Sequence, residues 1–158
     1  MPILEKPLTS KMGPEGSHVD IAAYERAGGY EAVRKILRGM EPKQITQMVK
    51  DSNLRGRGGA GFPTGTKWSL VPLGPDVPNP TYLVCNADEM EPGTFKDRLL
   101  MERDPHQLIE GMIVASYAIE ADVAYIFLRG EYTLAAERLS KALAEAYEKR
   151  YLGKNILG

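Results

Sequence analysis

A glycine-rich segment at residues 55–69 has the composition of a ligand-binding loop. Glycine buries little surface and loses the most backbone entropy on folding, so a packing role for such a run is disfavoured. We interpret it as bare backbone that approaches a flat or anionic group, such as a flavin ring or a phosphate. The flanking cations Arg55, Arg57 and Lys67 would add positive charge. The glycines of the run are Gly56, Gly58, Gly59 and Gly61, and Gly65 follows.

The order Gly56-x-Gly58-x-x-Gly61 has the letters of a dinucleotide-binding fingerprint but not its setting. That fingerprint follows a strand. Residues 42–53 predict a helix instead, because their apolar residues share one face and Pro42 suits a first helical turn. An ordinary Rossmann phosphate loop is therefore disfavoured. An unusual nucleotide or flavin loop is the leading interpretation, and a structural turn without a ligand is the alternative.

A second polar segment, residues 86–98, carries three carboxylates within four residues: Asp88, Glu89 and Glu91. It follows a predicted strand, and in α/β sheets ligands bind at the carboxyl ends of strands. Carboxylates repel phosphates but accept hydrogen bonds from hydroxyls and amides, so ribityl, ribose or carboxamide groups would suit them. A metal site is disfavoured because the spacing matches no calcium loop. An exposed acidic turn is the remaining alternative.

The second half of the chain alternates strands and helices. Residues 81–86 and 123–128 predict buried strands, and residues 106–120 predict a helix that is apolar on several faces. Residues 133–150 predict an amphipathic helix whose apolar face runs from Ala135 to Tyr147. This order predicts a parallel βαβ unit with a right-handed crossover. Two strands make a poor sheet against several helices. We therefore expect the sheet to need strands that these residues do not supply.

The first half predicts an arm and short helices. Residues 1–18 are aperiodic and contain Pro, Gly and Ser, which indicates an extended N-terminal arm. The last of the short helices would offer its N-terminus to an anion. We expect one domain over residues 19–158, of the α/β class, with a helical segment at its start. The short helices are expected at residues 21–27, 31–37, 42–53 and 65–71.

Composition excludes several classes of protein. The chain has 158 residues, which suits one domain, and 20 basic against 21 acidic residues give a net charge of −1. This charge argues against nucleic acid or an anionic membrane as the main partner. No apolar run approaches the roughly 18 residues of a membrane span, and no signal-peptide pattern opens the chain.

Two single residues could suggest chemistry of their own. The lone Cys85 excludes an internal disulfide and a multi-cysteine metal site, and it fits a reducing cytoplasmic setting. Within a predicted strand, Cys85 is interpreted as a core residue rather than a nucleophile. His106 is expected only to open a helix.

Two long motifs carry a family resemblance. Gly-Arg-Gly-Gly-Ala-Gly-Phe-Pro-Thr-Gly-x-Lys-Trp at 56–68 and Asn-Ala-Asp-Glu-x-Glu-Pro-Gly-Thr-x-Lys-Asp-Arg at 86–98 together resemble the NADH-binding flavoprotein subunit of respiratory complex I. The resemblance extends from Tyr30 to the end of the chain. Flavin subunits of NAD-linked hydrogenases and formate dehydrogenases share these motifs and are the alternative, together with a flavin-free docking fragment. Shorter segments that fit the family are Pro105-His106, Ile109–Met112, Arg129–Tyr132 and Leu152–Asn155.

The resemblance implies FMN in a partial Rossmann-like domain, with NADH stacked over the flavin. Hydride would pass from NADH to FMN, and electrons would leave singly through iron–sulfur clusters. Phe62 resembles the aromatic that stacks on adenine, Glu91 resembles the carboxylate beside the nicotinamide, and Leu70 replaces a second stacking aromatic of some members. Such hydride transfer needs no side chain as a catalytic nucleophile, because the cofactor carries the chemistry. By position, the FMN contacts fall on Gly56, Arg57, Gly58, Gly59, Gly61, Lys67, Asn86, Asp88 and Glu89.

Later motifs of the family do not occur within these residues. A Tyr-x-Cys-Gly-Glu-Glu-Thr-type stretch and the cysteine ligands of a [4Fe–4S] cluster are both missing. The chain is therefore expected to be the N-terminal part of such a subunit and to be inactive alone. The resemblance further implies other peripheral-arm subunits of complex I as partners, especially the thioredoxin-like [2Fe–2S] subunit. It places the assembly on the cytoplasmic side of the inner membrane, with no direct membrane contact by this chain.

Overall fold

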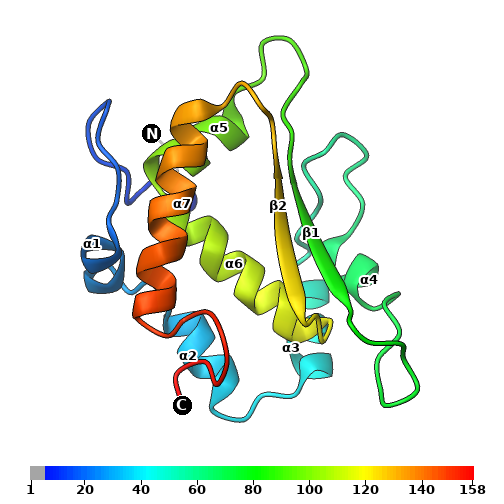
Figure 1. Ribbon diagram of the computed structural model, residues 1–158. Helices are drawn as coiled ribbons and strands as arrows, with labels where there is room; N and C mark the ends of the chain where they lie inside the picture. Colours follow the sequence, from blue (N-terminus) through cyan, green and yellow to red (C-terminus); the bar gives the residue numbers. More distant parts are fainter. Residues whose placement is uncertain (1–5) are drawn as a thin grey trace, which may run out of the picture. The chain divides into compact units, whose positions relative to one another are not determined.

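The computed structural model describes residues 6–158, which form an α/β fold with a two-stranded parallel sheet (Figure 1). Residues 6–18 contain turns but no helix or strand, and the rest of the predicted arm lies outside the described residues. The strands are β1, Tyr82–Ala87, and β2, Val123–Leu128. The helices are α1 Ile21–Arg26, α2 Glu31–Leu37, α3 Pro42–Asp51, α4 Thr64–Trp68, α5 Lys96–Arg103, α6 Pro105–Ala118 and α7 Thr133–Glu148.

The chain divides into two compact units, and each has its own hydrophobic cluster. One unit, here unit 1, contains the residues up to Glu31 together with 86–111 and 126–158. Unit 2 contains residues 32–85 and 112–125. The division cuts both strands and α6, so each unit holds part of the parallel pair.

Unit 1 packs α7 against its neighbours through one apolar stripe. Ala135, Leu139, Ala142 and Ala146 recur at helical spacing, and all four are buried, as the periodicity predicts. Helices α1 and α5 lie beside α7 (Figure 1). Tyr147, which we predicted on the same face, is 59% exposed. That prediction is wrong because Tyr147 lies at the margin of the stripe, one position beyond Ala146.

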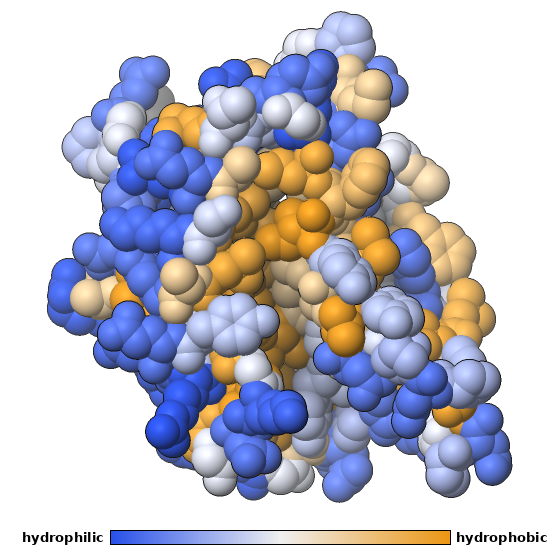
Figure 2. All heavy atoms as spheres, in the orientation of Figure 1, coloured by the Kyte–Doolittle hydropathy of each residue, from blue (hydrophilic) through white to orange (hydrophobic). Residues whose placement is uncertain are grey.

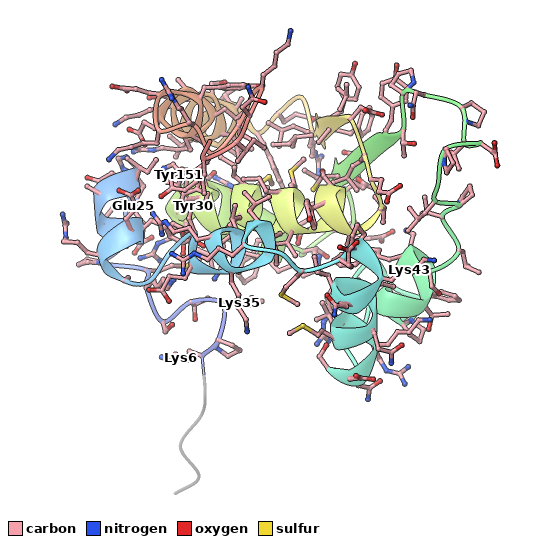
Figure 3. The ribbon with its side chains drawn as sticks, turned by 90° about the horizontal axis from the view of Figure 1, so that it is seen from below. Lys6, Glu25, Tyr30, Lys35, Lys43 and Tyr151 are labelled. Atoms are coloured by element: carbon pink, nitrogen blue, oxygen red, sulfur yellow. The ribbon has the colours of Figure 1, made fainter. Side chains whose placement is uncertain are left out.

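A polar network joins distant segments of unit 1, and it gives His106 more than the helix-opening role that we expected. The His106 ring is fully buried, with Nδ1 2.9 Å from the Tyr30 hydroxyl and Nε2 3.0 Å from a carboxylate oxygen of Glu145. Tyr30 stacks on Tyr151 at 3.8 Å between ring centroids, and the Tyr151 hydroxyl donates to Glu25 (Figure 3). Burial raises the pKa of Tyr30 well above its ordinary value, so its hydroxyl stays protonated.

Unit 2 packs α3 against the short helix α4. Gly65 makes this contact possible, because a Cβ at that position would lie 2.4 Å from the backbone nitrogen of Lys50. Trp68 packs at the margin of a cluster formed by Ile36, Ile45 and Ala118. Helix α4 ends at Trp68 rather than at residue 71 as predicted. Its five residues give it only a weak helix dipole, and anion binding at its N-terminus stays a prediction.

The apolar composition of the strands led us to expect burial on both faces, and this prediction is wrong. Alternate residues are uncovered: Tyr82 and Val84 of β1 are 53% and 60% exposed, and Tyr125 and Phe127 of β2 are 56% and 60% exposed. Side chains alternate between the two faces of a sheet, so only one face is covered. Figure 2 shows apolar side chains uncovered at the surface. Cys85, in β1, is half-buried and is not part of a disulfide.

Among residues 6–158, no helix is both long and apolar enough to cross a membrane.

Candidate functional site

The glycine-rich segment at residues 55–69, here called the glycine loop, belongs to unit 2 and is closed at its base like a hairpin. Arg55 and Pro63 form an antiparallel bridge, and the Gly56 N–H donates to the Phe62 carbonyl at 2.9 Å. The Arg55 guanidinium donates to the Gly61 carbonyl at 3.4 Å. Residues 57–61 therefore form the tip of a loop with a fixed base. As expected, a helix rather than a strand precedes it, namely α3.

The glycines of the loop have different reasons to be glycine. Gly59 and Gly61 have φ angles of +115° and +62°, a region that disfavours side chains. Gly58 has an ordinary φ, and a Cβ there would meet no atom within 4 Å. Neither the backbone nor packing within the described residues requires glycine at position 58. Gly65, by contrast, is explained by its contact with Lys50.

The cations and the aromatic residue of the loop face solvent. Arg57 and Lys67 are exposed, and no carboxylate of the described residues forms an ion pair with either. Phe62 is 48% exposed and Leu70 is 72% exposed. The loop thus presents open backbone, two unpaired cations and an uncovered ring, which together suit an anionic, aromatic ligand.

The segment at residues 86–98, here called the acidic loop, lies in unit 1. It runs from the end of β1 to the first turn of α5 and begins with a tight turn. The Asn86 side-chain oxygen accepts a hydrogen bond from the Asp88 N–H at 3.0 Å. Asn86 and Glu91 are exposed, and Asp88 is half-buried. No described residue donates a hydrogen bond to the carboxylates of Asp88 or Glu91, so both can accept hydrogen bonds from a ligand.

Glu89 differs from its two acidic neighbours because its carboxylate is used within the protein. It is 5% exposed and accepts the backbone N–H groups of Asp97 at 3.0 Å and Arg98 at 3.1 Å. Lys96 lies 3.7 Å away. Burial alone would raise the pKa of Glu89, but these hydrogen bonds and Lys96 outweigh it and lower the pKa. An FMN contact by this carboxylate stays a prediction.

The predicted site residues thus form two groups, one in each unit. Unit 2 holds Gly56 to Lys67, and unit 1 holds Asn86 to Glu91. The sequence reasoning gave no role to Arg129 and Tyr132, although both belong to a short segment that fits the family. In unit 1 their side chains contact the acidic loop at the Glu89 carbonyl. Within the described residues, no three His, Cys, Asp or Glu side chains are grouped to hold a metal ion.

Comparison with known proteins gives a consistent result. Residues 49–156 match the family described as the Nuo51 FMN-binding domain. An NADH-quinone oxidoreductase subunit of Rhizobium meliloti is 60% identical over 87% of this chain and 32% of its own length. The corresponding NADH-quinone oxidoreductase subunit of Escherichia coli is 54% identical over 96% of this chain and 34% of its own length. The chain therefore spans 32–34% of the length of these curated relatives.

A solved structure is similar as well. An NAD+-reducing [NiFe]-hydrogenase in the H2-reduced state matches with a TM-score of 0.67 and 42% sequence identity. The match covers 84% of this chain and 22% of the hydrogenase chain.

Proposed function

Because the chain belongs to the family of the Nuo51 FMN-binding domain, we propose that it is the FMN- and NADH-binding part of an NADH-quinone oxidoreductase subunit. Gly58, which lies beside the exposed cation Arg57 on the loop that also carries Lys67, is the observation that carries this proposal. Its position is open, its φ is ordinary, and no contact within residues 6–158 requires a glycine there. A ligand that lies against the backbone would account for the missing side chain.

The residues of both loops fit the chemistry of this cofactor. When bound, FMN would accept hydride from NADH and pass the electrons on singly. Arg57 and Lys67 supply cations for the phosphate or the electron-rich edge of the ring. Phe62 offers a free face on which an adenine can stack.

The acidic loop supplies acceptors for the neutral parts of the ligands. The open carboxylate of Asp88 can accept hydrogen bonds from ribityl hydroxyls, and the Asn86 amide can donate to them. Glu91 can accept a hydrogen bond from the nicotinamide carboxamide. Among the described residues nothing donates a hydrogen bond to the carboxylates of Asp88 and Glu91. The Asn86 side chain uses only its oxygen, which accepts from the Asp88 N–H, so its amide N–H groups can still donate.

The names of the relatives support a proposal for the parent assembly. The curated relatives are subunits of NADH-quinone oxidoreductases, so the proposed partners are other peripheral-arm subunits, including a thioredoxin-like [2Fe–2S] subunit, on the cytoplasmic side of the membrane. A [4Fe–4S] cluster is proposed for the whole subunit rather than for these 158 residues, which contain a single cysteine. A flavin subunit of an NAD-linked hydrogenase is the second candidate, favoured by the likeness to the hydrogenase structure. The higher identity of the oxidoreductase subunits favours the first.

A flavin titration tests the proposal on the chain itself. FMN should lose fluorescence as the chain is added, and it should bind more tightly than riboflavin, which lacks the phosphate. Lys67→Ala should weaken FMN binding by roughly 1–3 kcal/mol, the range for a hydrogen bond to a charged group, and should leave riboflavin almost unaffected. Lys43→Ala, on the exposed side of α3, is the matched control. Equal binding of FMN and riboflavin, or no binding of either, would contradict the proposal.

A further inference from the structure

We propose that Arg129 is a positioning residue that holds the acidic loop in the shape required by the flavin; this inference rests on the proposed function. Arg129 follows β2 directly and lies in unit 1 with the loop. Its guanidinium Nη1 donates to the backbone carbonyl of Glu89 at 2.8 Å. Its backbone N–H lies 3.4 Å from the Ala87 carbonyl, which continues the pairing of the two strands.

Tyr132 supports the same carbonyl from the start of α7. Its hydroxyl lies 3.3 Å from both the carbonyl oxygen and a carboxylate oxygen of Glu89. The guanidinium groups of Arg129 and Arg98 each lie 5.7 Å from the centre of the Tyr132 ring. The Arg129 Nε also contacts the carboxylate of Glu131 at 3.2 Å. Arg129 is therefore held from several sides, and one of its hydrogen bonds goes to the loop backbone.

These contacts fix the loop at three points without using its free carboxylates. The Asn86 side chain holds the Asp88 N–H, the Glu89 carboxylate holds the start of α5, and Arg129 holds the Glu89 carbonyl. Asp88 precedes this last point in the sequence and Glu91 follows it. Their direction toward a ligand thus depends on a carbonyl that Arg129 and Tyr132 hold in place.

The negative charges around the acidic loop also favour a cation at position 129. Three carboxylates lie within four residues of the loop, and a flavin phosphate is also anionic. Lys96 compensates the Glu89 carboxylate at 3.7 Å. Arg129 brings a further positive charge to the carbonyl between Asp88 and Glu91, which lowers the cost of placing these carboxylates close together.

The test compares four variants of the 158-residue chain by FMN titration and by hydrogen exchange of the loop without FMN. Arg129→Met should weaken FMN binding by about tenfold, as expected for loss of a charged hydrogen bond, and should speed exchange of the Asp97 and Arg98 amides. Arg129→Lys keeps a charged donor and should recover most of the affinity. Tyr132→Phe should have a smaller effect in the same direction. Lys141→Met removes an exposed cation from α7 and should change neither readout.

The outcomes separate this inference from the proposed function. If the parent chain binds FMN and Arg129→Met binds it equally well, Arg129 does not position the site. Loss of affinity that Arg129→Lys fails to recover would also overturn the role given to its charged donor. If the parent chain binds no FMN, the proposed function fails for this chain, and the role of Arg129 toward a flavin fails with it.

Discussion

The Glu89 carboxylate accepts a hydrogen bond from the backbone N–H of Asp97 at 3.0 Å, and this contact ties the acidic loop to the first turn of α5. A carboxylate near a helix N-terminus satisfies free N–H groups and interacts favourably with the helix dipole. One of the three acidic residues of the loop therefore has a structural task, which leaves Asp88 and Glu91 available to a ligand.

The stability of the chain should depend on pH through Glu89. Its pKa is lower in the folded chain than the ordinary value of 4.5, so its contribution is fully present above that value and is lost as the pH falls through the folded pKa. Glu89→Gln should lower the free energy of unfolding by about 1–3 kcal/mol at pH 7. The difference from the parent should shrink below pH 4.5. Urea unfolding at several pH values measures it, and a difference independent of pH would contradict the assignment.

The Tyr30 hydroxyl should stabilise unit 1 through His106. Tyr30→Phe leaves Nδ1 of a fully buried imidazole without its partner, which should cost about 1–3 kcal/mol. Tyr147→Phe is the matched control, because the Tyr147 ring is 59% exposed. Chemical denaturation of the two variants under one set of conditions decides the point. Equal stability would show that the Tyr30–His106 contact contributes nothing.

Substitution by alanine should destabilise the chain at Gly65 but not at Gly58. Gly65→Ala brings a Cβ within 2.4 Å of the Lys50 backbone nitrogen, and overpacking of this kind costs about 1–3 kcal/mol. Gly58→Ala meets no atom within 4 Å and should leave the midpoint of thermal unfolding nearly unchanged. A stable Gly65→Ala variant would mean that α3 and α4 can move apart at no cost.

The 158-residue chain should not oxidise NADH at an appreciable rate, even with added FMN. Hydride transfer needs the two rings aligned at about 3–3.5 Å. The family resemblance implies that a later motif, which these residues do not contain, helps to form that stack. NADH–ferricyanide reductase activity is the measurement, with the full-length Escherichia coli relative as reference. Comparable turnover by the chain would show that the two loops suffice.

Local patterns predicted most of the fold correctly. Helix periodicity located α2 and the buried stripe of α7, and the apolar run at residues 123–128 has the bounds of β2. The family named from the two long motifs is confirmed by the match over residues 49–156. These features depend on residues close in sequence, so a single sequence is enough to show them.

The failed predictions and the missed contacts depend on residues that are far apart in the sequence but close in the structure. Tyr82 and Phe127 are apolar, but their exposure is set by which face of the sheet the helices cover. The burial of His106 requires Tyr30, which is 76 residues away. The contact of Arg129 with a carbonyl 40 residues earlier has no periodic signal, although its motif was visible. Long-range pairing of this kind cannot be read from spacing alone.

The most direct measurement for the central claim is FMN binding by Gly58→Val beside Gly111→Val. Both glycines have open surroundings and an ordinary φ, so neither valine should clash within the chain. Fluorescence titration of FMN should show binding by the parent and by Gly111→Val, and its loss in Gly58→Val, because only the valine at position 58 occupies the space of the ligand. Circular dichroism checks that both variants stay folded. A folded Gly58→Val chain that binds FMN as tightly as the parent would contradict the account.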